Sequence, residues 1–137
     1  MRLLNTKTLQ LKEFFLHQVP GYVILSHTWG EEEVTFEDVK LGQAKLRKGY
    51  KKLQGTCKQA LKDSYQWVWI DTCCINKSNS SELQESINSM YQWYANADQC
   101  YAYLLDIPHH KAGRSDQFAK SRWWTRGWTL RMPSCPS

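Results

Sequence analysis

Three short apolar runs, each ending abruptly in polar residues, dominate the hydrophobic pattern of the chain. They are Tyr22–Ser26, Trp67–Asp71 and Cys100–Leu105, and each has the length and composition of a buried β-strand. Between the runs, apolar residues recur at helical spacing from about Gly49 to Ser64 and from Ser81 to Tyr94. Strands that alternate with helices predict an α/β fold with a parallel sheet.

Each of the two predicted helices has an apolar side, and the residues on that side differ between them. The first is amphipathic, with these residues on its apolar side: Tyr50, Leu53, Cys57, Ala60 and Leu61. The second places these residues on its apolar side: Leu83, Ile87, Met90, Tyr91 and Tyr94. Ser81 with Gln84 fits a capping box at its start. Trp93 falls on the polar side, so we expect it either to be covered by another segment or to face a partner.

Composition indicates one folded domain. The chain has 137 residues, of which 42% are hydrophobic and seven are tryptophans, which argues against disorder. No window approaches the roughly 20 apolar residues of a membrane span, and the N-terminus lacks the pattern of a signal peptide. The five cysteines are odd in number and include the adjacent pair Cys73-Cys74. We therefore expect reduced thiols and a cytoplasmic location.

The net charge of +5 is concentrated in one segment. Eight Lys or Arg residues and no acid lie between Lys40 and Lys62. Such a cluster can bind nucleic acid. An amphipathic helix with a solvated face of Lys51, Lys58 and Lys62 explains it as well, and this explanation is preferred.

Polar side chains follow each apolar run and would meet at one edge of a parallel sheet. The residues that we expect to line a crevice there are Ser26, His27, Trp29, Asp71, Cys73 and Asp106. A serine hydrolase is disfavoured because adjacent Ser26 and His27 point to opposite faces of a strand, and Gly-x-Ser-x-Gly is absent. The competing interpretation is that these side chains hydrogen-bond the turns after the strands.

A metal site is also disfavoured. The cysteines form no Cys-x-x-Cys motif, and neighbouring thiols on a strand do not converge on one tetrahedral ion. We expect the cysteines to be small buried hydrophobic residues, without a metal or a cofactor.

Two acids open the second predicted helix. Glu82 or Glu85 could act on a ligand bound in the crevice. Carboxylates in a first helical turn also offset the helix dipole, which is the preferred interpretation.

The segment Ser121–Leu130 is rich in aromatic and basic residues. Its candidate interaction residues are Arg122, Trp123, Trp124, Arg126 and Trp128. Arginine stacked on indole can form a binding surface, and tryptophans can equally close a sheet. The sequence leaves these two alternatives open.

Five segments resemble, in order and spacing, the heterokaryon incompatibility domain of filamentous fungi. They are Tyr22–Gly30 (YVILSHTWG), Trp69–Ile75 (WIDTCCI), Ser81–Tyr94 (SELQESINSMYQWY), Cys100–Asp106 (CYAYLLD) and Ser121–Leu130 (SRWWTRGWTL). The opening MRLLNTKTL is also similar to the start of such proteins. The resemblance implies a lead-in at residues 1–21, the domain at 22–130 and a divergent tail at 131–137.

The resemblance also implies a fold and an activity to test. The family's domain is similar to toll/interleukin-receptor domains, a small flavodoxin-like parallel sheet of three or more strands flanked by helices. Some toll/interleukin-receptor-like domains cleave NAD with a catalytic glutamate. The family continues Gln-Glu-Leu after Trp-Thr-Leu, whereas this chain continues Arg131-Met132-Pro133. Met132 stands where the acid would be, so the resemblance implies a form without catalysis that is incomplete at its C-terminus.

Three hypotheses follow. The leading one is a signalling module of fungal non-self recognition and programmed cell death that binds other protein domains, including copies of itself. The alternative is an NAD glycohydrolase in which Glu82 or Glu85 replaces the missing acid and NAD is the substrate. The third is nucleic-acid binding through residues 40–62.

Overall fold

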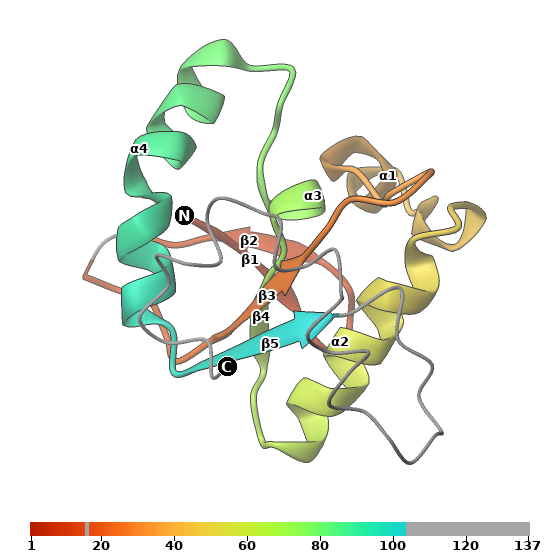
Figure 1. The fold of residues 1–137 in the computed structure, drawn as a ribbon, viewed down its shortest axis with the longest axis horizontal. Coiled ribbons are helices and arrows are strands. Elements are labelled where there is room, and N and C mark those ends of the chain that lie inside the picture. The colour runs from red at the N-terminus through yellow and green to blue at the C-terminus, as the bar shows by residue number, and fades with distance from the viewer. Residues whose placement is uncertain (16, 104–137) are drawn as a thin grey trace, which may run out of the picture.

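The computed structural model describes residues 1–15 and 17–103, and in this part the chain forms a five-stranded sheet flanked by helices (Figure 1). The strands are β1 (Arg2–Asn5), β2 (Leu11–Glu13), β3 (Val23–His27), β4 (Trp67–Trp69) and β5 (Gln99–Tyr103). The helices are α1 (Phe36–Lys40), the 3₁₀ helix η1 (Ala44–Leu46), α2 (Tyr50–Lys62), α3 (Asp71–Cys74) and α4 (Ser80–Asn96). The predicted α/β class is confirmed.

The sheet is mixed, with strand order β2-β1-β4-β3-β5. β3 pairs in parallel with β4 and with β5, so the three strands predicted from the apolar runs do run side by side in one direction. β1 pairs antiparallel with both β2 and β4. The expectation of an all-parallel sheet is therefore wrong, because residues 1–13 add an antiparallel hairpin to one side of it.

The turn between β1 and β2 is held by one side chain. Asn5 Oδ1 accepts hydrogen bonds from the backbone N–H groups of Lys7 (2.9 Å) and Thr8 (3.0 Å). The Leu9 N–H donates to the Asn5 carbonyl at 2.9 Å. An asparagine that mimics a backbone turn in this way is typical of short connections. Residues 2–5 and 11–13 of the N-terminal segment are thus part of the sheet.

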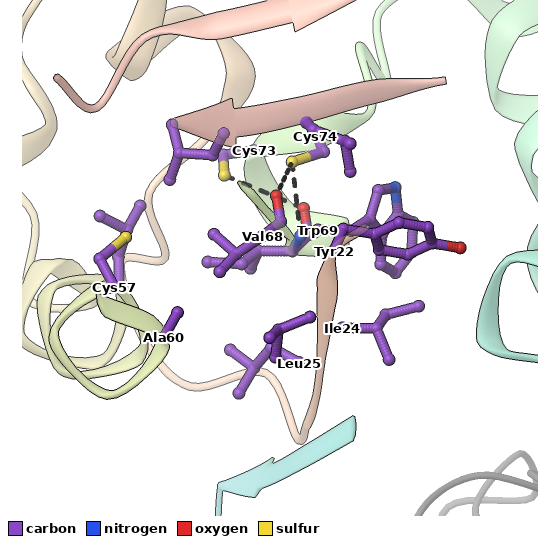
Figure 2. Packing of buried hydrophobic residues seen from close by; sticks show 14 of the residues in the cluster. Tyr22, Ile24, Leu25, Cys57, Ala60, Val68, Trp69, Cys73 and Cys74 are labelled. Carbon is purple, nitrogen blue, oxygen red and sulfur yellow. Dashed lines mark hydrogen bonds between the residues drawn. The ribbon is translucent and has the colours of Figure 1, made fainter. Parts of the chain in front are cut away.

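Helices α2 and α4 lie on opposite sides of the sheet (Figure 1). β3 is buried along its whole length, and the alternation of its side chains sends Ile24 toward α4 and Leu25 toward Cys57 and Ala60 of α2 (Figure 2). On the α4 side, the ring of Trp69 makes edge contacts with Trp93 and Tyr94 at centroid distances of 5.7 and 5.9 Å.

The second apolar run ends as a strand earlier than predicted. β4 stops at Trp69, and Asp71 opens the single helical turn α3. This turn directs the side chains of Cys73 and Cys74 back toward β4. There the Cys74 thiol accepts a hydrogen bond from the Ile70 N–H at 3.4 Å (Figure 2). The prediction that the cysteine pair lies on a strand is wrong, whereas their burial is as expected.

Three of the cysteines, Cys57, Cys73 and Cys74, are free and buried, which agrees with the expectation of reduced thiols at these positions.

Helix α2 forms as predicted, and α4 forms with a different cap and a different buried face. Asn79, not Ser81, caps α4, since its side-chain oxygen accepts from the N–H groups of Ser81 and Glu82. Ile87 and Tyr91 are exposed on α4, whereas Ser86 and Tyr94 are buried. In the described part of the chain, no helix combines the length and apolarity that crossing a membrane requires.

Candidate functional site

The carboxyl ends of β3 and β4 lie side by side because the two strands are parallel neighbours. His27 is the last residue of β3, and Asp71 follows β4 by two residues. His27 Nε2 lies 2.7 Å from Asp71 Oδ1, and Trp29 Nε1 donates to Asp71 Oδ2 at 2.9 Å. The structure thus brings together three of the residues that the sequence placed in a crevice.

Lys52 of α2 joins this group from the other side of the histidine ring. Its ammonium donates to His27 Nδ1 at 3.0 Å, to the carbonyl of Thr28 at 3.2 Å and to a carboxylate oxygen of Glu33. The same Glu33 oxygen accepts from the Gly30 N–H at 2.8 Å. We call Trp29, His27, Glu33, Lys52 and Asp71 the rim network.

The partners in the rim network assign the histidine tautomer. An ammonium group has donors only, so His27 Nδ1 is the acceptor from Lys52. The proton of the ring then lies on Nε2 and is donated to Asp71. Since the three N–H bonds of Lys52 go to three different acceptors, its charge is fully hydrogen-bonded.

His27, Lys52 and Glu33 form the buried part of the rim network. His27 is 0% exposed, and Lys52 and Glu33 are buried beside it. Burial alone would raise the pKa of Asp71, but hydrogen bonds from His27 and Trp29 and the charge of Lys77 outweigh this and hold that pKa below its ordinary value. Buried ions are tolerated only when they are paired and hydrogen-bonded, as they are here.

Trp29 and Lys77 form the exposed side of the rim. Trp29 is 48% exposed, and the Lys77 ammonium lies 3.4 Å from the centroid of its indole ring. Burial lowers the pKa of Lys77, and the negative charge of Asp71 partly offsets this. Because Asp71 holds the indole nitrogen, the ring is presented to solvent in one orientation.

Ser26 and Cys73 are buried but do not belong to the rim network. Ser26 follows Leu25 on the strand, so it faces the side of the sheet opposite to His27. A hydrogen bond with Cys74 and burial raise the pKa of Cys73 well above its ordinary value, which keeps the thiol protonated and poorly nucleophilic. Among the described residues, no cluster of three His, Cys, Asp or Glu could hold a metal ion.

The two candidate acids of α4 lie at a different place. Glu82 pairs with Arg2 and accepts from the Asn76 N–H at 3.2 Å. Glu82 and Glu85 line a cavity of about 270 Å³ that neither His27 nor Asp71 lines. The structure therefore does not bring these acids together with the strand-end residues.

Trp93 is half-buried, with its indole ring against Trp69. One side of this residue is thus covered by the sheet. The remaining candidates lie outside the described residues: Asp106, Arg122, Trp123, Trp124, Arg126, Trp128 and Met132.

Lys52 and Glu33 are the members of the rim network that sequence reasoning missed. Lys52 was counted with the basic helix, although it immediately precedes Leu53 and lies one turn before Thr56, both buried. A lysine at a helical position that faces the core is the signal that could have found it.

Comparison with known proteins decides the family. The family model described as "Heterokaryon incompatibility protein (HET)" matches residues 22–117, well over half of the chain. The chain belongs to the heterokaryon incompatibility family. The match includes β3, β4, β5 and the helices between them, and thus all of the rim network.

A heterokaryon incompatibility relative shares much of this sequence. The vegetative incompatibility protein HET-E-1 of Podospora anserina is 47% identical over 128 residues, which cover 88% of this chain. The aligned part is 9% of that protein, so the chain spans less than a tenth of the relative's length. No solved structure matches the chain.

Proposed function

We propose that this chain is an interaction module of the heterokaryon incompatibility type, which acts in fungal non-self recognition and programmed cell death by associating with like domains. The outer face of α4 carries this proposal. Its exposed residues are almost all uncharged, with Ile87 and Tyr91 at its centre and Glu85 as its single charge. Depletion of charge and enrichment in aromatic residues are typical of protein interfaces.

We also propose that the module works without catalysis. The polar atoms of His27, Lys52 and Asp71 bind one another inside the protein. A general base must reach its substrate directly or through one water, and a ring that is 0% exposed does not offer this. The rim network then serves to hold the loops after β3 and β4 in place.

For the fold, we propose the flavodoxin-like arrangement of toll/interleukin-receptor domains. The parallel strands β4-β3-β5, with α2 and α4 on opposite sides, support it. The hairpin of β1 and β2 is then an addition to the edge of that arrangement.

Light scattering at increasing protein concentration tests the association. We expect the mass of the chain to rise above that of a monomer across the micromolar range. The double variant Ile87→Lys/Tyr91→Lys should remain monomeric, because it places two cations in the centre of the proposed interface. Both residues are exposed, so the fold should tolerate the change.

A matched variant on α2 provides the control. Gln59→Lys/Leu61→Lys adds the same two charges to an exposed helix surface on the other side of the sheet. It should associate like the unmodified chain. A strictly monomeric unmodified chain, or equal loss of association in both variants, would overturn the proposal.

The absence of catalysis has its own assay. The purified chain is incubated with NAD, and nicotinamide release is followed. We expect no turnover above that of a Glu82→Ala/Glu85→Ala variant. Turnover that this variant lacks would replace the proposal with an NAD glycohydrolase.

A further inference from the structure

A groove of about 640 Å³ lies between the β1–β2 turn and the segment that runs from α1 to the start of α2. Neither the rim network nor the outer face of α4 takes part in it. Its apolar walls are formed by Leu9, Leu11, Phe36, Val39, Ala44 and Tyr50. Volumes of several hundred Å³ with mainly apolar walls are typical of small-molecule sites.

The charges around the groove are unbalanced. Arg2, Lys40 and Lys45 line it together with a single acid, Glu13. Arg2 is neutralised by Glu82. Within residues 1–15 and 17–103, neither Lys40 nor Lys45 forms an ion pair. Among the described residues, no carboxylate therefore pairs with these two ammonium groups at the groove.

The aromatic ring of Phe36 already interacts with cations. The Arg2 guanidinium and the Lys40 ammonium lie 4.7 and 6.0 Å from its centroid. These contacts place the Lys40 charge beside an apolar wall, and an anion bound there would contact the charge and the wall together.

The walls of the groove are held in place by the local backbone. Leu9 adopts the left-handed conformation with φ 57°, which costs a non-glycine residue about 1 kcal/mol or more. The Asn5 turn and packing of Leu9 against the core maintain it. On the opposite wall, Gly42 has φ +71°, a backbone conformation that favours glycine.

We infer that this groove binds a small amphipathic anion, an acyl or aryl carboxylate. Its apolar body lies against Phe36, Tyr50 and the aliphatic wall, and its carboxylate is neutralised by Lys40 and Lys45. A neutral ligand would leave both ammonium groups without a partner, and a cation would be repelled by them. A nucleic-acid strand requires an extended basic track, whereas these two charges flank one mostly apolar volume.

The first test uses two probes on the unmodified chain. Decanoate and decyltrimethylammonium have similar alkyl chains and opposite charges, and each is titrated below its micellar concentration in a calorimeter. We expect saturable 1:1 binding of decanoate and no saturable binding of the cation. Equal binding of the two probes, or no binding of decanoate, would overturn the inference.

The second test uses paired variants. Lys40→Gln/Lys45→Gln should weaken decanoate binding about tenfold, which corresponds to about 1.4 kcal/mol. Lys51→Gln/Lys58→Gln removes the same charge from exposed positions of α2 outside the groove and should leave binding unchanged. Equal weakening in both variants would show attraction to the net charge alone and would contradict a site. Thermal unfolding of each variant verifies that it is folded.

Discussion

Helices α2 and α4 cover opposite sides of one sheet (Figure 1). They differ in the kinds of residue that they bury and expose. α2 buries a charge, Lys52, among its core-facing residues and exposes a row of lysines to solvent. α4 buries Tyr94 and Ser86 and exposes Ile87 and Tyr91 on a face with one charge. The α2 side thus contains a buried ion pair within its packing, whereas α4 packs on the sheet through aromatic contacts and is paired at its start by Arg2 and Glu82.

We propose that the two sides of the sheet have different roles: the α2 side positions the loops after β3 and β4, and the α4 side contacts a partner. Ion pairs and hydrogen bonds on the α2 side have strict geometry, so they define where the loops after β3 and β4 lie. Aromatic contacts of Trp69 with Trp93 and Tyr94 hold the inner face of α4 on the sheet. In the proposed function, the outer face of α4 is the surface that a partner would contact.

The largest effect is expected from Lys52→Met. Removing the ammonium leaves the Glu33 carboxylate buried without its cation, which should lower the free energy of unfolding by about 3–5 kcal/mol. Urea unfolding measures this. Lys58→Met, at an exposed position of the same helix, should change it by less than about 0.5 kcal/mol. Similar values for the two variants would contradict a structural role of the rim network.

On the α4 side, two tyrosines three residues apart give a matched pair. Tyr94→Ala should cost about 3 kcal/mol, because the ring is 3% exposed and contacts Trp69. Tyr91→Ala removes a ring that is 54% exposed and should cost less than about 1 kcal/mol. The reverse order would mean that Tyr91, and not Tyr94, faces the sheet.

Two glycines of the α2 region offer a smaller contrast. A Cβ at Gly49 would lie 3.0 Å from Glu33 Cα and 2.8 Å from a Glu33 carboxylate oxygen. Gly49→Ala should therefore destabilise the chain by about 2 kcal/mol. A Cβ at Gly55 meets nothing within 4 Å, so Gly55→Ala should stabilise α2 by about 0.5–1 kcal/mol. Thermal unfolding distinguishes the opposite signs.

The smallest effect concerns pH. The folded pKa of Asp71 is lowered, so its carboxylate stabilises the fold at neutral pH, and this stabilisation disappears as the pH falls through that pKa. Asp71→Asn should cost about 1 kcal/mol at neutral pH. The difference in the free energy of unfolding between this variant and the unmodified chain should shrink as the pH falls below the ordinary aspartate pKa of about 3.9.

A pH-insensitive variant provides the comparison. Tyr94→Ala removes no group that titrates in acid, so its cost should stay constant over the same range. If the cost of Asp71→Asn in free energy of unfolding were also independent of pH, Asp71 would not be stabilised as a carboxylate in the folded chain.

Periodicity predicted the elements with long, regular patterns and missed the short ones. Strands β3, β4 and β5 and helix α2 follow from their apolar spacing. β1 (Arg2–Asn5) and β2 (Leu11–Glu13) contain no continuous apolar run that would mark them as strands, and they are defined by pairing with each other and, for β1, with β4. On α4, apolar residues occupy more than one side, so spacing alone did not reveal that Trp93 faces Trp69 while Tyr91 faces solvent.

The candidate site was predictable only where the backbone determines it. His27 and Asp71 could be placed together because parallel neighbouring strands end at one edge. Lys52 and Glu33 could not, because isolated lysine and glutamate belong at the surface, and only their mutual pairing makes burial tolerable. Composition and residue spacing do not determine which loop contacts which helix, because that depends on the tertiary structure.

The position of β4 between β1 and β3 has a consequence for synthesis of the chain. β1 and β3 leave the ribosome before β4, yet they are not neighbours in the finished sheet. β1 keeps an open edge until residues 67–69 emerge, and β3 keeps one until residues 99–103 emerge. Open edges recruit other chains. The nascent chain therefore exposes open strand edges until β4 and then β5 have paired.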